Sequence, residues 1–331
     1  MKPKVYVSRI IPEPGMSLLY EKCNVTLHAE KDLPPSRGEL LAISKETEGV
    51  LVLLTEKIDR EFLDNVRDLK VVSTYSVGLD HIDVRYATKR GIMVVNTPDV
   101  LTETTADFAF ALMLAASRRV AEGDRFIRAG LWNKPWSPYL LLGSDVHGST
   151  LGIVGLGRIG KAMARRALGF GMNVIYFDRK GRDIELEGLK IRYVGFDDLL
   201  STSDIISVHL PLNEETHHRF GEREFSLMKK SAVFVNAARG GIVDTRALYS
   251  ALNKGQIFSA GLDVFEEEPI DPGNPLLRLD NVVLAPHLGS ASVQARSKMA
   301  ELAASGLIDA LKGRAPKTLA NKEVLSQIGS R

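Results

Sequence analysis

The sequence predicts an α/β protein of two domains, each built on a parallel sheet with helices on both faces. The chain has 331 residues, which corresponds to about two domains of ~150 residues each. Hydrophobic residues make up 44% and charged residues 25%, as in ordinary globular proteins, so a disordered or fibrous chain is excluded. Short β-rich runs alternate with helix-period segments along the chain, and this alternation is typical of βαβ units.

Two series of β-rich runs predict the two sheets. The strands expected in the first sheet are residues 4–8, 25–28, 50–54, 71–74 and 92–96. The strands expected in the second sheet are residues 151–154, 174–178, 205–209, 232–236, 259–263 and 282–285. Helical patterns separate the runs, so the strands should be parallel, because crossover helices must pack back on the strands that they join.

A long apolar helix is predicted between the two series, from residue 101 to residue 120. Its apolar residues include a stripe with spacing i, i+3, i+4, i+7, namely Phe108, Ala111, Leu112 and Ala115, which Phe110 and Leu114 widen. A helix this apolar should be buried on several sides. The following loop is rich in aromatic residues and prolines, namely Trp132, Trp136, Pro138 and Tyr139. Packing inside one subunit and a homodimer contact are therefore both consistent with this segment.

The last helical pattern, residues 290–312, has no strand after it, so it should pack back on the first domain. We therefore expect a discontinuous first domain, residues 1–98 plus 288–331, and a second domain of residues 99–287. Two connections between the domains would permit hinging. The tail after Gly313 is expected to be loosely ordered.

Charge and composition exclude several classes of protein. Lys and Arg total 43 and Asp and Glu total 41, so the net charge is 43 − 41 = +2, too small for a nucleic-acid footprint. The longest apolar run, residues 108–116, is about half the length needed to cross a bilayer, and the chain begins with a strand instead of a signal peptide. Cys23 is the only cysteine, which excludes an intramolecular disulfide and a cysteine-rich metal site. We expect a cytoplasmic protein that binds neither nucleic acid nor a membrane.

A glycine-rich loop follows the strand at 151–154 and leads into a helical segment at 161–169. It reads Gly155-Leu156-Gly157-Arg158-Ile159-Gly160. Gly155 permits the tight turn, Gly157 lets the backbone approach a pyrophosphate, and Gly160 permits close contact of helix and strand. The positive N-terminal end of the helix attracts the anion. The loop therefore predicts a dinucleotide site in a Rossmann domain.

Asp178 ends the next predicted strand, 23 residues after Gly155, where a carboxylate can accept hydrogen bonds from an adenosine ribose. Its charge would repel the ribose phosphate of NADP, so NAD is the expected cofactor. Arg179 and Lys180 follow directly and could bind that phosphate, which keeps NADP open. Arg158 is expected to contact the pyrophosphate, with a solvated surface arginine as the alternative.

Three polar residues lie near the C-terminal ends of predicted strands, where open α/β sheets bind their ligands. They are Arg239, Glu268 and His287. Their segments, the glycine-rich loop and residues 75–83 and 104–107 resemble the D-2-hydroxyacid dehydrogenase family over nearly the whole chain. Residues 263–269 and 289–291 are most similar to the glyoxylate and hydroxypyruvate reductases of that family. The resemblance implies a flavodoxin-like first domain and a doubly wound Rossmann second domain.

The three residues suit the reaction that the resemblance implies. Reduction of a 2-keto acid delivers a hydride to carbon and a proton to oxygen, so it needs an acid near neutral pH; imidazole, with a free pKa of about 6.5, is suitable. His287 is expected to be that acid. Glu268 should hydrogen-bond the other ring nitrogen and favour the imidazolium. Arg239 should bind the substrate carboxylate through its planar guanidinium group.

The resemblance also assigns contacts to further residues. The cofactor contacts expected are Thr105, Gly155, Gly157, Arg158, Ile159, Gly160, Asp178, His209, Pro211, Ala237, Arg239, Asp263, His287 and Gly289. The substrate contacts expected are Leu54, Val77, Gly78, Arg239 and His287. Glu266 and Glu267 precede Glu268 in an acidic run for which a solvated loop is the simplest interpretation.

The substrate implied is a small 2-keto or 2-hydroxy acid of D configuration, with glyoxylate or hydroxypyruvate reduction as the main hypothesis and a homodimer as the expected assembly. Such reductases often carry a tryptophan that reaches the neighbouring subunit's site; Leu140 aligns with it here, and Trp136 lies four residues earlier. D-3-phosphoglycerate dehydrogenase is the alternative within the enzyme class. An NADH-sensing, corepressor-like binding protein is the alternative outside it, since such proteins keep the same three residues.

Overall fold

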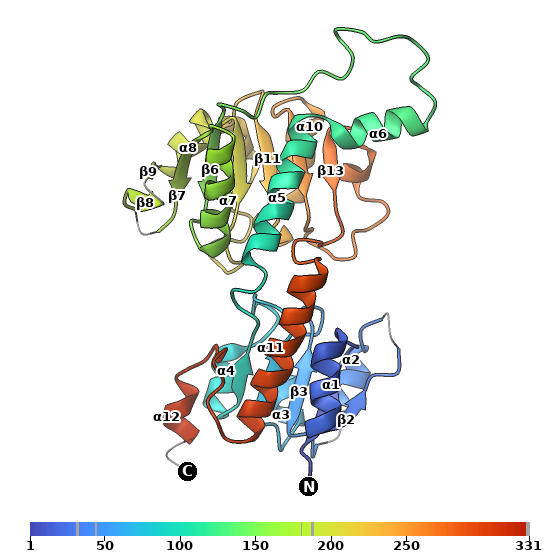
Figure 1. The fold of residues 1–331 in the computed structure, drawn as a ribbon, viewed down its shortest axis with the longest axis vertical. Helices are drawn as coiled ribbons and strands as arrows, with labels where there is room; N and C mark the ends of the chain where they lie inside the picture. The colour runs from blue at the N-terminus through green and yellow to red at the C-terminus, as the bar shows by residue number, and fades with distance from the viewer. Residues whose placement is uncertain (31–32, 44, 180, 187–188, 329–331) are drawn as a thin grey trace. The chain divides into compact units, whose positions relative to one another are not determined.

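The structure is a computed structural model that describes residues 1–30, 33–43, 45–179, 181–186 and 189–328. The chain divides into two compact units, Met1–Leu101 with Ala291–Arg331, and Thr102–Ser290 (Figure 1). The predicted boundaries lay after residues 98 and 287, and the chain changes unit after residues 101 and 290. Within the described ranges, no helix combines the length and the apolar character needed to span a membrane.

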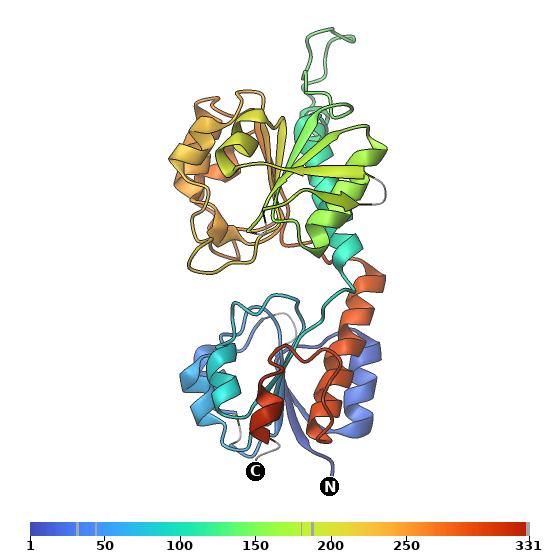
Figure 2. The same cartoon turned by 90° about the vertical axis from the view of Figure 1, so that its left-hand side faces the viewer.

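The first unit contains a parallel sheet with the strand order β2-β1-β3-β4-β5. Its strands are β1 (Lys4–Val7), β2 (Asn24–Leu27), β3 (Gly49–Val52), β4 (Val71–Thr74) and β5 (Met93–Val95). This is the flavodoxin order, so the predicted fold of the unit is confirmed. Helices α1 (Glu13–Lys22) and α11 (Val293–Leu311) cover one face (Figure 2). Helices α2 (Arg37–Leu41), α3 (Arg60–Asn65) and α4 (Val84–Lys89) cover the other.

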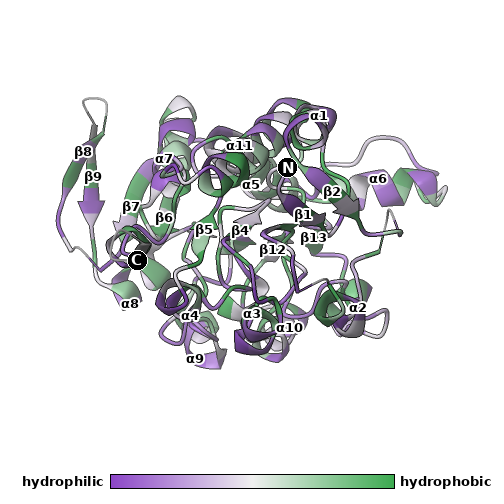
Figure 3. Ribbon diagram, turned by 90° about the horizontal axis from the view of Figure 1, so that it is seen from below, coloured by the Kyte–Doolittle hydropathy of each residue, from purple (hydrophilic) through white to green (hydrophobic). Residues whose placement is uncertain are grey.

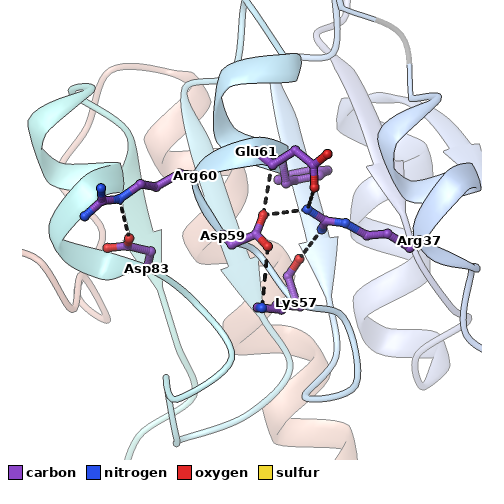
Figure 4. Close-up of polar contacts among 7 residues, drawn as sticks. Arg37, Lys57, Asp59, Arg60, Glu61 and Asp83 are labelled. Atoms are coloured by element: carbon purple, nitrogen blue, oxygen red, sulfur yellow. Dashed lines mark hydrogen bonds and ion pairs between the residues drawn. The ribbon is translucent and has the colours of Figure 1, made fainter.

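Two aspartates fix the beginnings of α3 and α4. Asp59 and Asp83 are the N-cap residues, and each accepts a backbone N–H bond from the first turn of its helix. Arg37 pairs with Asp59 at 2.6 Å and Arg60 pairs with Asp83 at 3.3 Å (Figure 4). These caps therefore fix the points at which the loops after β3 and β4 end.

Residues 318–321, after Gly313, are held against the first sheet, so the expectation of a loosely ordered tail was wrong for the described residues up to 328; residues 329–331 lie outside the described residues. Asn321 is buried, accepts the Val94 N–H at 2.7 Å and donates to the Ile92 carbonyl at 2.9 Å. Leu319 forms an antiparallel bridge with Val95. A short helix, α12 (Val324–Ile328), follows. The Asn321 side-chain amide and one backbone bridge hold this segment, and hydrophobic periodicity does not reveal such contacts.

The second unit contains a sheet with the order β13-β12-β11-β10-β6-β7-β9-β8. Its strands are β6 (Thr150–Val154), β7 (Asn173–Phe177), β8 (Ile184–Leu186), β9 (Leu189–Tyr193), β10 (Ile205–Val208), β11 (Val233–Asn236), β12 (Ser259–Leu262) and β13 (Val282–Leu284). The chain starts in the middle at β6 and winds outward in both directions, as in a Rossmann domain. The sequence did not predict β8 and β9, which form an antiparallel hairpin at the edge beyond β7 (Figure 3).

Helices cover both faces of this sheet. Helices α5 (Thr102–Ser117) and α7 (Arg158–Gly169) pack on one face, and α8 (Phe196–Thr202), α9 (Glu222–Leu227) and α10 (Thr245–Asn253) pack on the other. Short 3-10 helices lie at η1 (Gly240–Ile242) and η2 (Pro275–Arg278).

The buried face of α5 differs from the predicted stripe. Ala111 of that stripe is exposed, whereas Ala109, Met113 and Ala116 are buried together with Leu112. Because nearly every position of this helix is apolar, periodicity does not fix its rotation. Small alanines face the sheet and α7, where close packing selects them.

Helix α6 (Val120–Arg128) and the loop that follows it extend away from the rest of their unit (Figure 1). We call residues 120–145 the arm. Helix α6 has no buried residue and contains both hydrophobic and hydrophilic residues (Figure 3). Trp136 is 81% exposed and Tyr139 is 83% exposed. The arm therefore carries several large apolar side chains that no other part of the described chain buries.

Candidate functional site

The glycine-rich loop has the geometry required for a close approach of backbone to a phosphate. Gly155 has φ +97°, and a Cβ there would lie 2.6 Å from the His209 carbonyl oxygen. A Cβ on Gly160 would lie 2.2 Å from the Gly155 oxygen, whereas a Cβ on Gly157 would meet nothing within 4 Å. In the described chain no side chain caps α7, so its first N–H groups can face an anion. These features fit the pyrophosphate of a dinucleotide.

Asp178 directly follows β7, and its Oδ1 accepts the Gly181 N–H at 3.3 Å. Arg179, one of the two cations that could bind a ribose phosphate, forms an exposed ion pair with Glu215 at 3.3 Å. Lys180, the other, lies outside the described residues.

The turn that carries His287 is fastened to Asp263 at the end of β12. The His287 N–H donates to the Asp263 carbonyl at 2.9 Å, and His287 itself has φ +54°. The Asp263 carboxylate accepts the N–H groups of Leu288 at 2.6 Å and Gly289 at 2.7 Å. Burial raises the pKa of Asp263 even though these two donors and His287 act to lower it. A Cβ on Gly289 would lie 3.2 Å from the Thr105 side chain, so Thr105, Asp263 and Gly289 meet at one place.

His287 and Glu268 form the hydrogen bond that the sequence predicted. Nδ1 of His287 lies 2.7 Å from Oε2 of Glu268, and the other Glu268 oxygen accepts the Phe265 N–H at 3.0 Å. Burial raises the pKa of Glu268, but the His287 bond, the Phe265 N–H and the positive charge of Arg239 outweigh it and leave this pKa below its ordinary value. Glu268 is therefore ionised near neutral pH and can accept a hydrogen bond from Nδ1 of His287. The engaged Nδ1 leaves Nε2 as the nitrogen that can face a substrate.

Arg239 follows β11 and is positioned by Asn236, which is 1% exposed. The Asn236 amide accepts the Ala238 N–H at 3.0 Å and donates to the Arg239 carbonyl at 2.9 Å. A Cβ on Gly240 would lie 1.8 Å from the Phe265 carbonyl carbon, so the segments after β11 and β12 are in direct contact. This contact brings Arg239 and Glu268 into one site.

The other predicted cofactor residues of this unit lie where strands β6, β10 and β11 end. They are Arg158, Ile159, His209, Pro211 and Ala237. Since β6 and β11 both pair in parallel with β10, these segments leave the same edge of the sheet. The His209 Nε2 lies 2.9 Å from the Ser207 hydroxyl, and burial lowers the pKa of His209 to about 4. His209 is therefore neutral and not a proton donor for the reaction at neutral pH.

The predicted substrate residues Leu54, Val77 and Gly78 belong to the first unit. Leu54 follows β3 and is 38% exposed; Val77 and Gly78 follow the neighbouring parallel strand β4. The Val77 carbonyl accepts the Asn96 amide at 2.9 Å, and the Gly78 carbonyl accepts the Ser76 hydroxyl at 2.8 Å. In the described chain neither amide N–H of Val77 and Gly78 donates a hydrogen bond, so both can bind an anion.

Sequence reasoning missed a second histidine–glutamate pair. Nε2 of His218 contacts Oε1 of Glu266, so Glu266 is bonded and does not simply face solvent as its acidic run suggested. The partner lies 48 residues away, in the segment between β10 and α9. The only signal in the sequence was the acidic run itself.

Comparison with known proteins identifies the family of this architecture. Residues 110–289, more than half of the chain, match the family model for the NAD binding domain of D-isomer specific 2-hydroxyacid dehydrogenases. The chain belongs to the D-isomer specific 2-hydroxyacid dehydrogenase family. The matched residues include the glycine-rich loop, Arg239, Glu268 and His287. The protein is thus an NAD(P)-dependent oxidoreductase of this family.

Relatives of this 2-hydroxyacid dehydrogenase cover its full length. A glyoxylate reductase of Thermofilum pendens is 53% identical over 325 residues, covering 98% of this chain and 96% of the relative. A crystal structure of a Thermus thermophilus protein superposes with a TM-score of 0.88 at 43% identity, covering 96% of this chain and 99% of that one. An NADPH-dependent glyoxylate/hydroxypyruvate reductase of Sinorhizobium meliloti, solved with NADP and malonate, has a TM-score of 0.84 at 32% identity, covering 98% of each chain.

Proposed function

We propose that this protein reduces glyoxylate and hydroxypyruvate with NADH, as a D-2-hydroxyacid dehydrogenase. The observation that carries the proposal is the 2.7 Å contact of His287 with an ionised Glu268, in the same site as Arg239. The glycine-rich loop of the same unit supports dinucleotide binding. Relatives that are 47–53% identical are named glyoxylate reductase, which supports the choice of substrate.

A nicotinamide cofactor would supply the hydride when it is bound. Nε2 of His287 donates a proton to the keto oxygen, and Glu268 stabilises the imidazolium before transfer. The planar guanidinium group of Arg239 binds the substrate carboxylate and polarises the keto group. Leu54, Val77 and Gly78 of the first unit stay predicted substrate contacts, and the amide N–H groups of Val77 and Gly78, free within the described chain, support this prediction. The reverse oxidation requires neutral His287 as the base.

We further propose NAD as the preferred cofactor. The pyrophosphate would lie on Gly155, Gly157 and Gly160. The rest of the NAD site would be lined by Thr105, Arg158, Ile159, His209, Pro211, Ala237, Asp263 and Gly289. Asp178 would accept the ribose hydroxyls, and its charge disfavours the phosphate of NADP. The ion pair of Arg179 with Glu215 supports this preference, because Arg179 is one of the two cations that could bind the ribose phosphate of NADP.

The proposed assembly is a cytoplasmic homodimer. The exposed aromatic residues of the arm support self-association, since monomers rarely expose so large an apolar segment. The single, buried Cys23 is consistent with a reducing compartment.

Steady-state NADH oxidation tests the proposed activity. Glyoxylate, hydroxypyruvate, pyruvate and 3-phosphohydroxypyruvate are compared as substrates, each with NADH and with NADPH. Higher kcat/KM for glyoxylate or hydroxypyruvate supports the proposal, and a preference for 3-phosphohydroxypyruvate would replace it with phosphoglycerate dehydrogenase. Tight NADH binding with negligible turnover of all four acids would instead identify a dinucleotide sensor.

A further inference from the structure

We infer that His218 is a positioning residue: through Glu266 it joins the segment that carries Arg239 to the segment that carries Glu268. The inference rests on the proposed function of Arg239 and Glu268. We call the side-chain contact the His218–Glu266 bridge. Neither residue is expected to touch substrate or cofactor, so the bridge acts only through the geometry of the reacting groups.

The main chain of His218 is attached to the Arg239 segment. Its N–H donates to the Gly241 carbonyl at 2.9 Å, two residues after Arg239. The pairing continues because the Phe220 N–H donates to Ile242 at 3.1 Å and the Asp244 N–H donates to Phe220 at 3.0 Å. These bonds fix the backbone of His218 independently of its side chain.

The side chain of His218 is attached to the Glu268 segment. Its Nε2 contacts Oε1 of Glu266, and Oε2 of Glu266 accepts the Thr245 N–H at 3.1 Å at the first residue of α10. Burial raises the pKa of Glu266, but the bonds from Thr245 and His218 outweigh it and keep this pKa below its ordinary value. Glu266 is therefore an ionised group with two partners, and it lies two residues before Glu268.

The conformation of His218 indicates that the arrangement is specifically maintained. His218 has φ +49°, a left-handed conformation that is uncommon for residues other than glycine and that occurs where surrounding contacts stabilise it. The His217 ring stacks on the His218 ring with centroids 4.0 Å apart, which further limits the rotation of the imidazole.

The bridge lies beside the contact that sets the distance between Arg239 and Glu268. Gly240 packs directly on the Phe265 backbone, so a shift of either segment moves Arg239 relative to Glu268 and His287. Displacement of reacting groups by about 1 Å can cost on the order of 100-fold in rate. Loss of the bridge should therefore lower kcat more than it changes cofactor binding.

Four single variants and the double variant of His218→Asn with Glu266→Ala test the inference. His218→Asn keeps a residue that accepts the left-handed backbone but is too short to reach Glu266. Glu266→Ala removes the other partner, and Glu266→Gln keeps an acceptor for the Thr245 N–H and a partner for His218. Glu267→Ala is the matched control, since Glu267 is an exposed neighbour in the same acidic run.

We expect His218→Asn and Glu266→Ala each to lower kcat for the preferred 2-keto acid about tenfold to 100-fold. The dissociation constant of NADH should stay within about twofold, and the deuterium isotope effect with 4-deuterated NADH should rise, because hydride transfer becomes slower. The double variant should be no slower than the slower single variant, since both remove one interaction. Glu266→Gln should recover most of the rate, and Glu267→Ala should resemble the wild type.

Wild-type kcat in His218→Asn and Glu266→Ala, or additive losses in the double variant, would overturn the inference. Amide hydrogen exchange of residues 239–244 and 264–268 in the NADH-bound protein measures how firmly the bridge holds the two segments, and it does not depend on catalytic activity. Exchange should accelerate in His218→Asn and not in Glu267→Ala. If the wild type reduces no 2-keto acid but the variants show this exchange pattern, the proposed function is rejected and the bridge is retained. If exchange is unchanged in His218→Asn, the bridge is rejected.

Discussion

His287 is held by groups that come from separate parts of the sequence. The Asp263 carbonyl holds its N–H, the Asp263 carboxylate holds the next two amides, and Glu268 holds Nδ1. These contacts limit the orientation of the imidazole and leave Nε2 facing away from Glu268. A proton donor with a fixed position loses little entropy when the reaction occurs.

His287→Asn should lower kcat by about 10²- to 10⁴-fold, because it removes the proton donor while Asn accepts the left-handed backbone at φ +54°. NADH affinity, measured by fluorescence titration, should stay near its wild-type value. His147→Asn, which replaces an exposed histidine ahead of β6, serves as the control. Unchanged turnover in His287→Asn would exclude this residue as the acid.

The pairing of Glu268 should appear in the pH dependence of stability. Its pKa is lowered in the folded protein, so its contribution to stability is present above the ordinary carboxyl pKa and is lost as the pH falls through the lowered value. Wild type should therefore be more stable than Glu268→Gln at pH 7, and the difference should shrink toward pH 3. Urea unfolding across this range measures it, and a constant difference would contradict the assignment.

Asp178→Ala should narrow the preference for NADH over NADPH, because it removes the charge that repels the ribose phosphate. The ratio of kcat/KM for the two cofactors measures the effect. Asp183→Ala, a change at a nearby aspartate that instead accepts the Tyr193 N–H, is the control. An unchanged ratio in Asp178→Ala would show that another group sets the preference.

Helix α7 begins in the glycine-rich loop, and its position depends on Gly160, for which the sequence predicted close contact of helix and strand. Gly160→Ala places a Cβ 2.2 Å from the Gly155 carbonyl oxygen, whereas nothing lies within 4 Å of a Cβ on Gly169 at the end of the same helix. Gly160→Ala should therefore weaken NADH binding at least tenfold and lower Tm. Gly169→Ala should leave both unchanged or raise Tm slightly. Titration and thermal unfolding of the two variants provide the comparison, and equal behaviour would contradict close packing of α7 on the loop.

Elements with strong local signals could be predicted from the sequence, and elements stabilised by distant contacts could not. The central strands are apolar on both faces, and the three glycines of the loop have fixed spacing, so both were evident. The hairpin of β8 and β9 is short and carries Glu185 and Arg192, which hide any alternation at an exposed edge. The roles of Asn321 and His218 depend on partners that no local pattern identifies. The His287–Glu268 contact could be predicted because the segments of both residues resemble a known family, whereas nothing in the sequence beyond the acidic run pointed to the His218–Glu266 bridge.

The arm carries the exposed aromatic residues Trp132, Trp136 and Tyr139, and its proposed role concerns the assembly as a whole. Sedimentation equilibrium should give a mass about twice that of the 36.4 kDa chain. Replacing Trp136 and Tyr139 together by serine should shift the mass toward the single chain, because both rings are more than four-fifths exposed. Tyr20→Ser, at an exposed tyrosine of α1, should leave the mass unchanged. A wild-type mass of one chain, or a dimer that survives the double substitution, would exclude the arm as the interface.

The discontinuous first unit has a consequence for how the chain acquires its structure on the ribosome. Helix α11 packs against α1, β3 and β4, but it is synthesised after the whole of the second unit. Residues 102–290 can complete their fold while the polypeptide is still being elongated, whereas the flavodoxin-type sheet must wait for its last covering helix. Residues 1–101 of the nascent chain therefore keep part of an apolar face uncovered until α11 has been synthesised, and this is the stage at which chaperones or aggregation would act on it.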